Sequence, residues 1–436
     1  MKRTLAALII IGLTAVQIPA LINNLYSFEL ANGLKVFLVP EPNAEYASLL
    51  VYHLTGARDE PAGIQGASFL YQYLIYQKTE NLEAGDHFLI MSKTAGAMAS
   101  RINYDYSSFY KIVPDTEINT VLWLESERLR SLQLDDHILD QQKKLFNSRI
   151  VRKRGGSVEN RAYNWVHAAI LQGTAYEKHL YGDAGNLVNA DNSDLLKLYR
   201  NFTDPARIIL VISGRFAIDE LKNLINRYFQ SLPAGSRTRP VTFFPAEPRR
   251  EIIFENWVEA DLPYNLVVIG FRFPARISHD QVFTDFLRYY LIDERLSRLD
   301  YALNQANNLE ARINNDLTDY FEANSFTIQI STRKRIQLEQ AKYVLNRELE
   351  FIQGTPLKSQ DLRTVKTLME LDYLKNLSRP EERSYLIADT FHRYRNLGHL
   401  ESHLKRIQRI TAFDIQRAAK KYLNRDNQVI LNVYAE

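Results

Sequence analysis

The sequence predicts an α+β protein built from two homologous lobes, each a mainly antiparallel sheet with helices packed on one face. Its 436 residues exceed one ordinary hydrophobic core, so two domains of roughly 200 residues each are expected. Hydrophobic residues make up 46% and charged residues 24% of the chain, the balance of a folded globular protein. The strings "DLLKLYRNFTDPARIILVISG" and "DIQRAAKKYLNRDNQVILNVYA" both run from a helix through a polar turn into an apolar strand, which indicates an internal duplication.

The first residues have the pattern of a secretory signal peptide. Lys2 and Arg3 precede an apolar run at 5–16, and Pro-Ala follows at 19–20. The run is too short to cross a bilayer, which takes about 20 apolar residues. We therefore expect residues 1–20 to be a cleaved signal peptide and the mature chain to be periplasmic or otherwise exported, without stable membrane insertion. An uncleaved anchor is the alternative.

The first lobe is expected over residues 21–235. "SFELANGLKVFLVPEP" predicts two strands joined by an Asn-Gly turn, and "ASLLVYHLTGA" a buried strand. The segment "MASRINYDYSSFYKIVP" alternates and predicts one or two strands, and "ARIILVISG" predicts the last strand of the lobe. Helical periodicity predicts helices at 66–76, 87–93, 118–132, 135–154 and 193–202.

A proline-rich stretch separates the two lobes. "PAGSRTRPVTFFPAEPRR" contains few helix formers and predicts a linker at 236–252. The second lobe, 253–436, repeats the plan of the first, because "YNLVVIGFRFP" matches the earlier buried strand and "SFTIQIST" the alternating one, with helices after them.

Composition excludes several classes of function. The net charge of +3, from 54 basic and 51 acidic residues, gives no field that would attract nucleic acid. The absence of cysteine removes disulfides, thiolate nucleophiles and cysteine zinc sites, so any metal would need His and carboxylates. Motifs of serine hydrolases, P-loop proteins and dinucleotide-binding proteins are absent as well.

Four strings, in their order along the chain, resemble segments of the insulinase (pitrilysin) family of zinc metallopeptidases, which includes the mitochondrial processing peptidases. "ELANGLKVFLVPEP" is similar to the family's opening hairpin and "HLTGARDEPAGIQGASFLYQYL" to the segment with its zinc motif. "VLWLESERLRSL" is similar to the helix that follows, and "YEKHLYGD" to the segment before the last helix of the lobe. The resemblance spans nearly the whole mature chain and implies a duplicated, metallopeptidase-like half-clamshell.

The zinc motif of active members is altered at every position. The family has His-x-x-Glu-His, in which two imidazoles hold zinc and the Glu activates a water, and a later Glu is the third ligand. The resemblance places Ser68 and Gln72 at the His positions, Tyr71 at the catalytic Glu and Ser148 at the third ligand. Ser and Gln are poor zinc donors, and a Tyr with a pKa of ~10 is no base near neutral pH. We expect a pseudo-metallopeptidase without metal or cofactor, in which these residues fill or line a former cleft.

The second lobe of active members supplies an Arg and, seven residues later, a Tyr, which hold the substrate carbonyl. "SRLDYALNQANNLEA" resembles that segment and places Asn304 and Ala311 at the two positions. The resemblance thus implies that this contribution is lost too. Arg298 or Arg312 together with Tyr301 is the alternative pair.

The string "HLESH" places His399 and His403 one helical turn apart with Glu401 between them. This spacing can bind zinc, but it is not the family's motif, and the charged surroundings favour a solvated helix.

The aromatic string "NYDYSSFYKI" corresponds to the strand beside the family's cleft, where substrate peptides add as an extra strand. We expect Asn103, Tyr104, Tyr106 and Phe109 to form an edge strand that could hold an extended peptide or pack on a partner chain.

The favoured function is a non-catalytic, exported partner of a zinc-bearing insulinase-family subunit, with a chamber-forming, substrate-retaining or regulatory role. The resemblance to the family's heterodimers implies that partner. The first alternative is a stand-alone peptide-binding or scaffold protein, such as a homodimer. The second is an active metallopeptidase with a rearranged site at His399 and His403.

Overall fold

The computed structural model describes residues 24–151, 156–182, 185–235, 245–260, 262–296 and 298–436. The expected signal peptide, the end of the helix expected at 135–154, and residues 236–244 of the expected linker lie outside these ranges. No helix in the described ranges combines the length and the apolar character that a membrane crossing requires.

The chain divides into two compact units, each containing a segment from the other half of the chain. The described residues of the first unit fall within Met1–Val151, Leu180–Val241 and Tyr373–His403. Those of the second fall within Arg152–His179, Thr242–Asp372 and Leu404–Glu436. The compact units therefore differ from the contiguous lobes, 21–235 and 253–436, that the repeat predicts.

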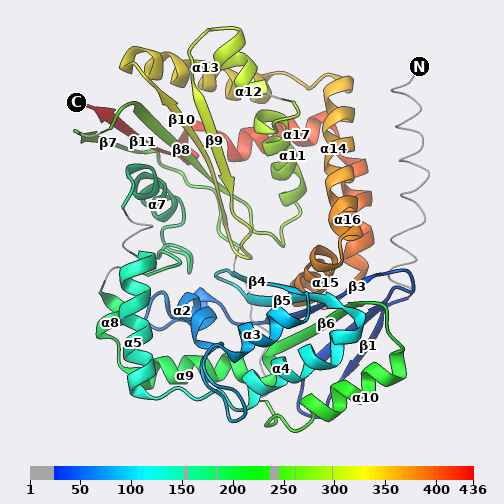
Figure 1. Cartoon of the computed structure of the whole chain (residues 1–436). Coiled ribbons are helices and arrows are strands. Elements are labelled where there is room, and N and C mark those ends of the chain that lie inside the picture. The colour runs from blue at the N-terminus through cyan, green and yellow to red at the C-terminus, as the bar shows by residue number, and fades with distance from the viewer. Residues whose placement is uncertain (1–23, 152–155, 183–184, 236–244, 261, 297) are drawn as a thin grey trace. The chain divides into compact units, whose positions relative to one another are not determined.

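Each unit is built on one sheet (Figure 1). The first sheet has the order β1-β2-β6-β3-β5-β4, in which only β2 and β6 pair in parallel. Its strands are β1 (Tyr26–Glu29), β2 (Lys35–Pro40), β3 (Tyr46–His53), β4 (Ala97–Ile102), β5 (Ser107–Pro114) and β6 (Ile208–Gly214). The second sheet has the order β7-β11-β8-β10-β9, in which only β7 and β11 are parallel. Its strands are β7 (Ile253–Glu259), β8 (Asn265–Phe273), β9 (Arg312–Leu317), β10 (Asn324–Thr332) and β11 (Gln428–Ala435).

The two sheets share one topology. In each, the first of five successive strands pairs in parallel with the fifth, and the second, fourth and third strands follow across the sheet. The chain is thus a mixed α+β protein with a repeated sheet, as the paired helix-turn-strand strings predict.

The helices of the first unit include those that the sequence predicts. They are α2 (Ala67–Leu74), α3 (Asp86–Lys93), α4 (Ile118–Arg130), α5 (Asp136–Phe146), α8 (Asn186–Asn189), α9 (Asn192–Thr203), α10 (Ile218–Phe229) and α15 (Pro380–Tyr394). The π-helical turn η3 (Asn147–Val151) follows α5. Neither α8 nor α10 was predicted from the sequence.

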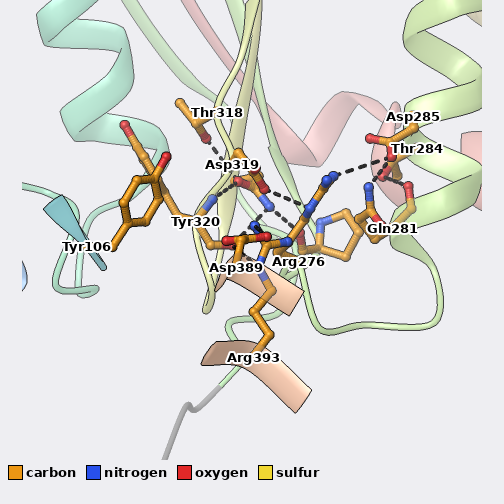
Figure 2. A network of polar contacts seen from close by, with 12 residues as sticks. Tyr106, Arg276, Gln281, Thr284, Asp285, Thr318, Asp319, Tyr320, Asp389 and Arg393 are labelled. Carbon is orange, nitrogen blue, oxygen red and sulfur yellow. Dashed lines mark hydrogen bonds and ion pairs between the residues drawn. The ribbon is translucent and has the colours of Figure 1, made fainter. Parts of the chain in front are cut away.

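The helices of the second unit are α7 (Val158–Ile170), α11 (Gln281–Ile292), α12 (Arg298–Asp300), α13 (Arg335–Gly354) and α17 (Ala412–Tyr422), and η5 (Tyr301–Gln305) is a π-helical turn. Residues of α14 (Ser359–Ser378) and α16 (Gly398–Arg409) belong to both units. Near the start of α11, Arg276 forms ion pairs with Asp285 and Asp319, at 3.5 and 2.8 Å (Figure 2). These ion pairs fix the connection between β8 and α11.

Both faces of each sheet are covered, whereas the sequence analysis expected helices on one face. In the first sheet Leu49 and Val51 pack in a cluster that contains α4 side chains, while Leu50 and Tyr52 pack with Ile387 of α15. In the second sheet, α11, α13 and α17 contribute to the core on one face. On the other face α7 lies against β8, β10 and β11 (Figure 1). The second face of each sheet is covered by a helix from the opposite half of the chain.

Candidate functional site

The site begins with α2, whose start is fixed by the carboxyl group of Glu60 and by Gly66. Glu60 accepts hydrogen bonds from the backbone N–H groups of Gly66 (2.8 Å) and Ser68 (2.7 Å), which would otherwise lack partners at a helix start. Burial nevertheless raises the pKa of Glu60 to about 7. Gly66 has a φ of 92°, and a Cβ there would lie 2.4 Å from the carbonyl oxygen of Tyr181, so only glycine fits.

The residues that the resemblance places at the first zinc ligand and the catalytic base, Ser68 and Tyr71, lie inside the protein. Ser68 and Tyr71 both have 0% exposure. The ring of Tyr71 stacks on Phe202 at 4.2 Å and lies 5.3 Å from the ring of Tyr199. Burial raises the pKa of Tyr71 to about 12, and its hydroxyl has no hydrogen-bond partner within the described residues. A phenol in this environment stays protonated near neutral pH and cannot replace a carboxylate base.

The other two positions are engaged in local contacts. Gln72 is partly exposed, and its Oε1 accepts a hydrogen bond from Ser100 of β4 at 3.0 Å. Ser148 is exposed in the π-helical turn η3, and its hydroxyl donates to the carbonyl oxygen of Leu145. The structure does bring this segment against α2, because the ring of Phe146 lies 6.0 Å from that of Phe69. The structure therefore brings together the two segments, α2 and η3, that the resemblance assigns to the zinc site, and their side chains there suit zinc poorly.

A buried charge cluster that the sequence analysis missed lies beside Tyr71. Glu125 of α4 forms ion pairs with Lys111 of β5 and with Arg128. The guanidinium of Arg128 lies 4.9 Å from the centre of the Phe109 ring, which is itself 6.2 Å from that of Tyr71. Two basic side chains share the one carboxylate of Glu125, so this carboxylate is already engaged and is not free to hold a metal ion. The cluster could have been predicted from Lys111, a charged residue at an inward-facing position of β5.

In the second unit, two hydrogen bonds join the side chain of Asn304 to the backbone of Ala311. Asn304 Oδ1 accepts from the backbone N–H of Ala311 at 2.7 Å, and its Nδ2 donates to the carbonyl of Ala311 at 2.9 Å. Asn304 thus holds a turn. In the alternative pair, Arg298 forms an ion pair with Glu348 at 2.7 Å, while Tyr301 is 63% exposed. Arg312 is exposed on β9.

The two imidazoles of the HLESH string contact aromatic rings. His399 stacks on Tyr394 at 3.9 Å, and His403 lies 4.6 Å from the ring of Tyr373. Within the described residues, no three His, Asp or Glu side chains are grouped so that they could hold a metal ion. A rearranged zinc site at these two residues therefore has no third ligand in the described part of the chain.

The expected edge strand is placed differently from the prediction. Asn103, Tyr104 and Tyr106 lie in the turn between β4 and β5, and Phe109 is buried on β5, which is an inner strand. The turn forms because the backbone N–H of Asn103 donates to the carbonyl of Tyr106 at 2.9 Å. The edge on this side of the first sheet is β4, which pairs with β5 alone, and β1 is the edge on the opposite side.

Comparison with known proteins agrees with this fold. Residues 35–184 match the family model described as "Insulinase (Peptidase family M16)", and residues 189–369 match "Peptidase M16 inactive domain". Zinc protease PqqE of Helicobacter pylori is 21% identical over 404 residues, which are 91% of this chain and 89% of that protein. Mitochondrial-processing peptidase subunit beta of Lentinula edodes is 19% identical over 306 residues, 68% of this chain and 63% of that protein.

A solved structure shows the same fold. The crystal structure of a protease from Helicobacter pylori superposes with a TM-score of 0.86 at 19% identity, covering 94% of this chain and 99% of the other. The two family matches follow one another along the chain, and the residues they cover include strands of both copies of the repeated sheet. This protein belongs to the insulinase (peptidase M16) family.

Proposed function

We propose that this chain is a non-hydrolytic, exported subunit that pairs with a zinc-bearing member of its own family. The burial of α2 carries the proposal. Two of the positions that hold the metal and the base in active members, Ser68 and Tyr71, have 0% exposure and lie in a packed core. A catalytic water needs an open coordination position and a base within hydrogen-bond reach, and neither side chain supplies one.

The electrostatics of the core support the same proposal. Zinc in a protein site is stabilised by anionic or imidazole ligands. Here the carboxyl group of Glu60 already accepts the backbone N–H groups at the start of α2, and two basic side chains, Lys111 and Arg128, share the single carboxylate of Glu125. Burial and Arg128 lower the pKa of Lys111 well below its ordinary value, which reflects the cost of adding positive charge to this core. A metal ion would meet the same cost.

The relatives support pairing. Several matched relatives are named as subunits, among them the beta subunit of a mitochondrial processing peptidase and subunit 1 of the cytochrome b-c1 complex. For the present chain, the second family match is to the inactive domain type. A subunit without its own zinc site would act by closing a chamber, retaining substrate or regulating the active partner.

The test is a measurement of zinc and of peptide hydrolysis, with the purified mature chain alone and mixed with a zinc-bearing homologue encoded nearby. We expect substoichiometric zinc and no hydrolysis by the chain alone, and a stable complex with the homologue. A chain that stays monomeric and never alters the homologue's activity contradicts the proposal. Stoichiometric zinc and hydrolysis that are both lost in the His399→Ala, His403→Ala double variant would establish the rearranged site instead.

A second candidate function is a stand-alone protein that holds extended peptides. The observation that favours it is the position of β4 at the edge of the first sheet, where a peptide could add as a further strand. A homodimer in solution that binds unfolded peptides, without any complex with a homologue, would favour this candidate over the first.

A further inference from the structure

A cavity of about 670 Å³ lies in the second unit, whereas the altered zinc positions belong to the first. It is lined by residues from the end of α11, from α12 and η5, and from the first turns of α14. Its volume lies within the range of small-molecule sites, roughly 300–1,000 Å³. The adjoining backbone is irregular, because η5 is a π-helical turn and Asn308 and Glu310 after it both have a φ of 50°. Such geometry is more common at functional sites than elsewhere.

The lining carries uncompensated negative charge. Asp361, in the first turn of α14, makes no hydrogen bond or ion pair within the described residues. Asp300 accepts one hydrogen bond, from Nδ2 of Asn304 at 2.7 Å, and has no basic partner in the described ranges. Two carboxylates at one cavity attract a cation and repel an anion.

The single arginine of the lining is already neutralised. Arg298 pairs with Glu348 at 2.7 Å, and its guanidinium lies 4.8 Å from the ring of Tyr290 and 5.0 Å from that of Phe351. It is therefore held by two rings and a carboxylate, and serves to fix the ring of Tyr290.

Two tyrosines complete the cavity. Tyr290 is 4% exposed and lines the cavity, yet its hydroxyl makes no hydrogen bond within the described residues, so its oxygen is left to accept one from a ligand. Tyr301 is 63% exposed, and its ring makes no aromatic or cationic contact in the described part of the chain. A free aromatic face beside carboxylates is a favourable place for an ammonium or guanidinium group.

We propose that this cavity binds an organic cation, a primary ammonium or guanidinium at the end of an aliphatic stem. The charged end would lie between Asp300 and Asp361 and donate to the hydroxyl of Tyr290. The stem would lie along Leu296 and Val365, which also line the cavity. A lysine or arginine side chain of a peptide and a free polyamine share this chemistry. The site lies within one unit and does not depend on pairing with a zinc-bearing subunit.

The experiment is calorimetric titration of the purified mature chain with cadaverine, N-acetyl-lysine amide and glutarate. We expect saturable binding of at least one amine and none of glutarate. Asp361→Asn should weaken amine binding about fivefold, the effect of removing one partly screened charge. Asp219→Asn is the matched control, since Asp219 is an exposed acid in the first turn of α10, and it should leave the affinity unchanged.

The arms of the titration separate the sources of the cation. Binding of N-acetyl-lysine amide as tight as that of cadaverine indicates a peptide side chain, and binding of the diamine alone indicates a free polyamine. Tyr301→Ala removes an exposed ring and should weaken binding even if Asp361→Asn disturbs α14. Absence of saturable binding by both amines overturns the proposal, as does equal binding of glutarate or an affinity that neither variant changes.

Discussion

Each unit completes its sheet with a helix from the other half of the chain, but the contacts that hold the two helices differ. In the second unit α7 is held by close packing, by arginines at its carboxyl end and by two side-chain contacts, Tyr163 with Asp316 and His167 with Tyr320. In the first unit α15 is held by buried polar groups that include titratable side chains. A packed contact tolerates changes of pH, whereas a buried polar contact does not.

The contact of α7 depends on a glycine and two guanidinium groups. Gly270 of β8 lets α7 approach so closely that an added Cβ would lie 2.2 Å from Cδ1 of Ile170. Arg272 donates to the carbonyl oxygens of Ile170 and Gln172, and Arg249 donates to that of Ala169. Cations at these carbonyl groups also offset the negative end of the helix dipole.

The contact of α15 is a set of hydrogen bonds and ion pairs. The hydroxyl of Tyr52 on β3 lies 3.4 Å from Asp389 Oδ1 and 3.3 Å from Nδ1 of His392. Arg383 pairs with Glu41 and donates to the hydroxyl of Ser213 on β6. Within the helix, Arg393 pairs with Asp389 (Figure 2). These polar groups are satisfied by one another, so removal of one leaves others buried without a partner.

The largest effect is expected for Arg383→Met, which leaves Glu41 without its cation. Breaking a mostly buried ion pair should lower the free energy of unfolding by about 3 kcal/mol. Arg379→Met is the control, because Arg379 is exposed and its ion pair with Glu381 is long, at 3.6 Å, so it should change stability by less than ~0.5 kcal/mol. Urea unfolding followed by circular dichroism measures both. Equal effects would show that α15 does not depend on this contact.

Gly270→Ala should lower the free energy of unfolding by about 1–2 kcal/mol, because the new methyl group overlaps Ile170 and Val166 of α7. Gly354→Ala is its control, since a Cβ there meets nothing within 4 Å and replaces glycine at the end of a helix. That variant should be neutral or more stable by up to ~1 kcal/mol. If both substitutions stabilise the protein, close packing of α7 is not what holds it.

Tyr52→Phe should lower the free energy of unfolding by about 1 kcal/mol, because it removes the contacts of a buried hydroxyl group. Tyr46→Phe is the matched control, because Tyr46 lies on the same strand but is half exposed, and it should leave the free energy of unfolding unchanged. The same unfolding measurement applies. A silent Tyr52→Phe would mean that packing alone holds α15.

The smallest effect is a difference in acid sensitivity between the units. Burial lowers the pKa of His392 well below its ordinary value, and Arg395, Arg393 and Arg58 add to that shift. The folded state then holds a neutral ring, while the unfolded chain binds a proton below a pH of about 6.5. The stability of α15 is therefore complete above that pH and declines as the pH falls through it. His392→Asn should flatten this decline.

Hydrogen exchange at pH 7 and pH 5 measures this difference. The first unit contains two more buried histidines with lowered pKa values, His53 and His87, the latter at about 2. The second unit contains His167, whose pKa is lowered by burial to about 3. Amides of β3 should lose protection from hydrogen exchange at pH 5 before those of β8. The reverse order would contradict the greater acid sensitivity of the first unit.

Much of the fold could be predicted from local patterns, and the misses have physical causes. The Asn-Gly hairpin, α2, α3, α4, α9 and the inner strands follow from turn residues and periodicity, which act over short distances. The second covered face was missed although Leu49, Leu50, Val51 and Tyr52 form an apolar run without alternation, a pattern typical of strands buried on both faces. The helix that covers such a strand can come from any part of the chain, and no local pattern identifies it.

The altered site could be predicted from the resemblance only in part. The segments of Ser68, Tyr71, Gln72 and Ser148 fall on α2 and η3, but the burial of Tyr71 against Phe202 depends on α9, far along the chain. The pairing of Lys111 with Glu125 likewise joins β5 to α4. The edge strand was misplaced because strand order in a sheet is set by tertiary pairing, which composition does not encode.

Because each sheet is covered on one face by a helix from the opposite half of the chain, the first sheet cannot be fully covered until α15 has been synthesised. All strands of the first sheet have been made once β6 ends at Gly214, but Leu50, Tyr52 and Val211 have no cover on one face until Ile387 follows. At ~5–20 residues per second the ribosome takes about 10–30 seconds to reach α15. Throughout that interval the growing chain carries an uncovered apolar sheet, so a chain that stops before residue 380 should be a substrate for chaperones and proteases.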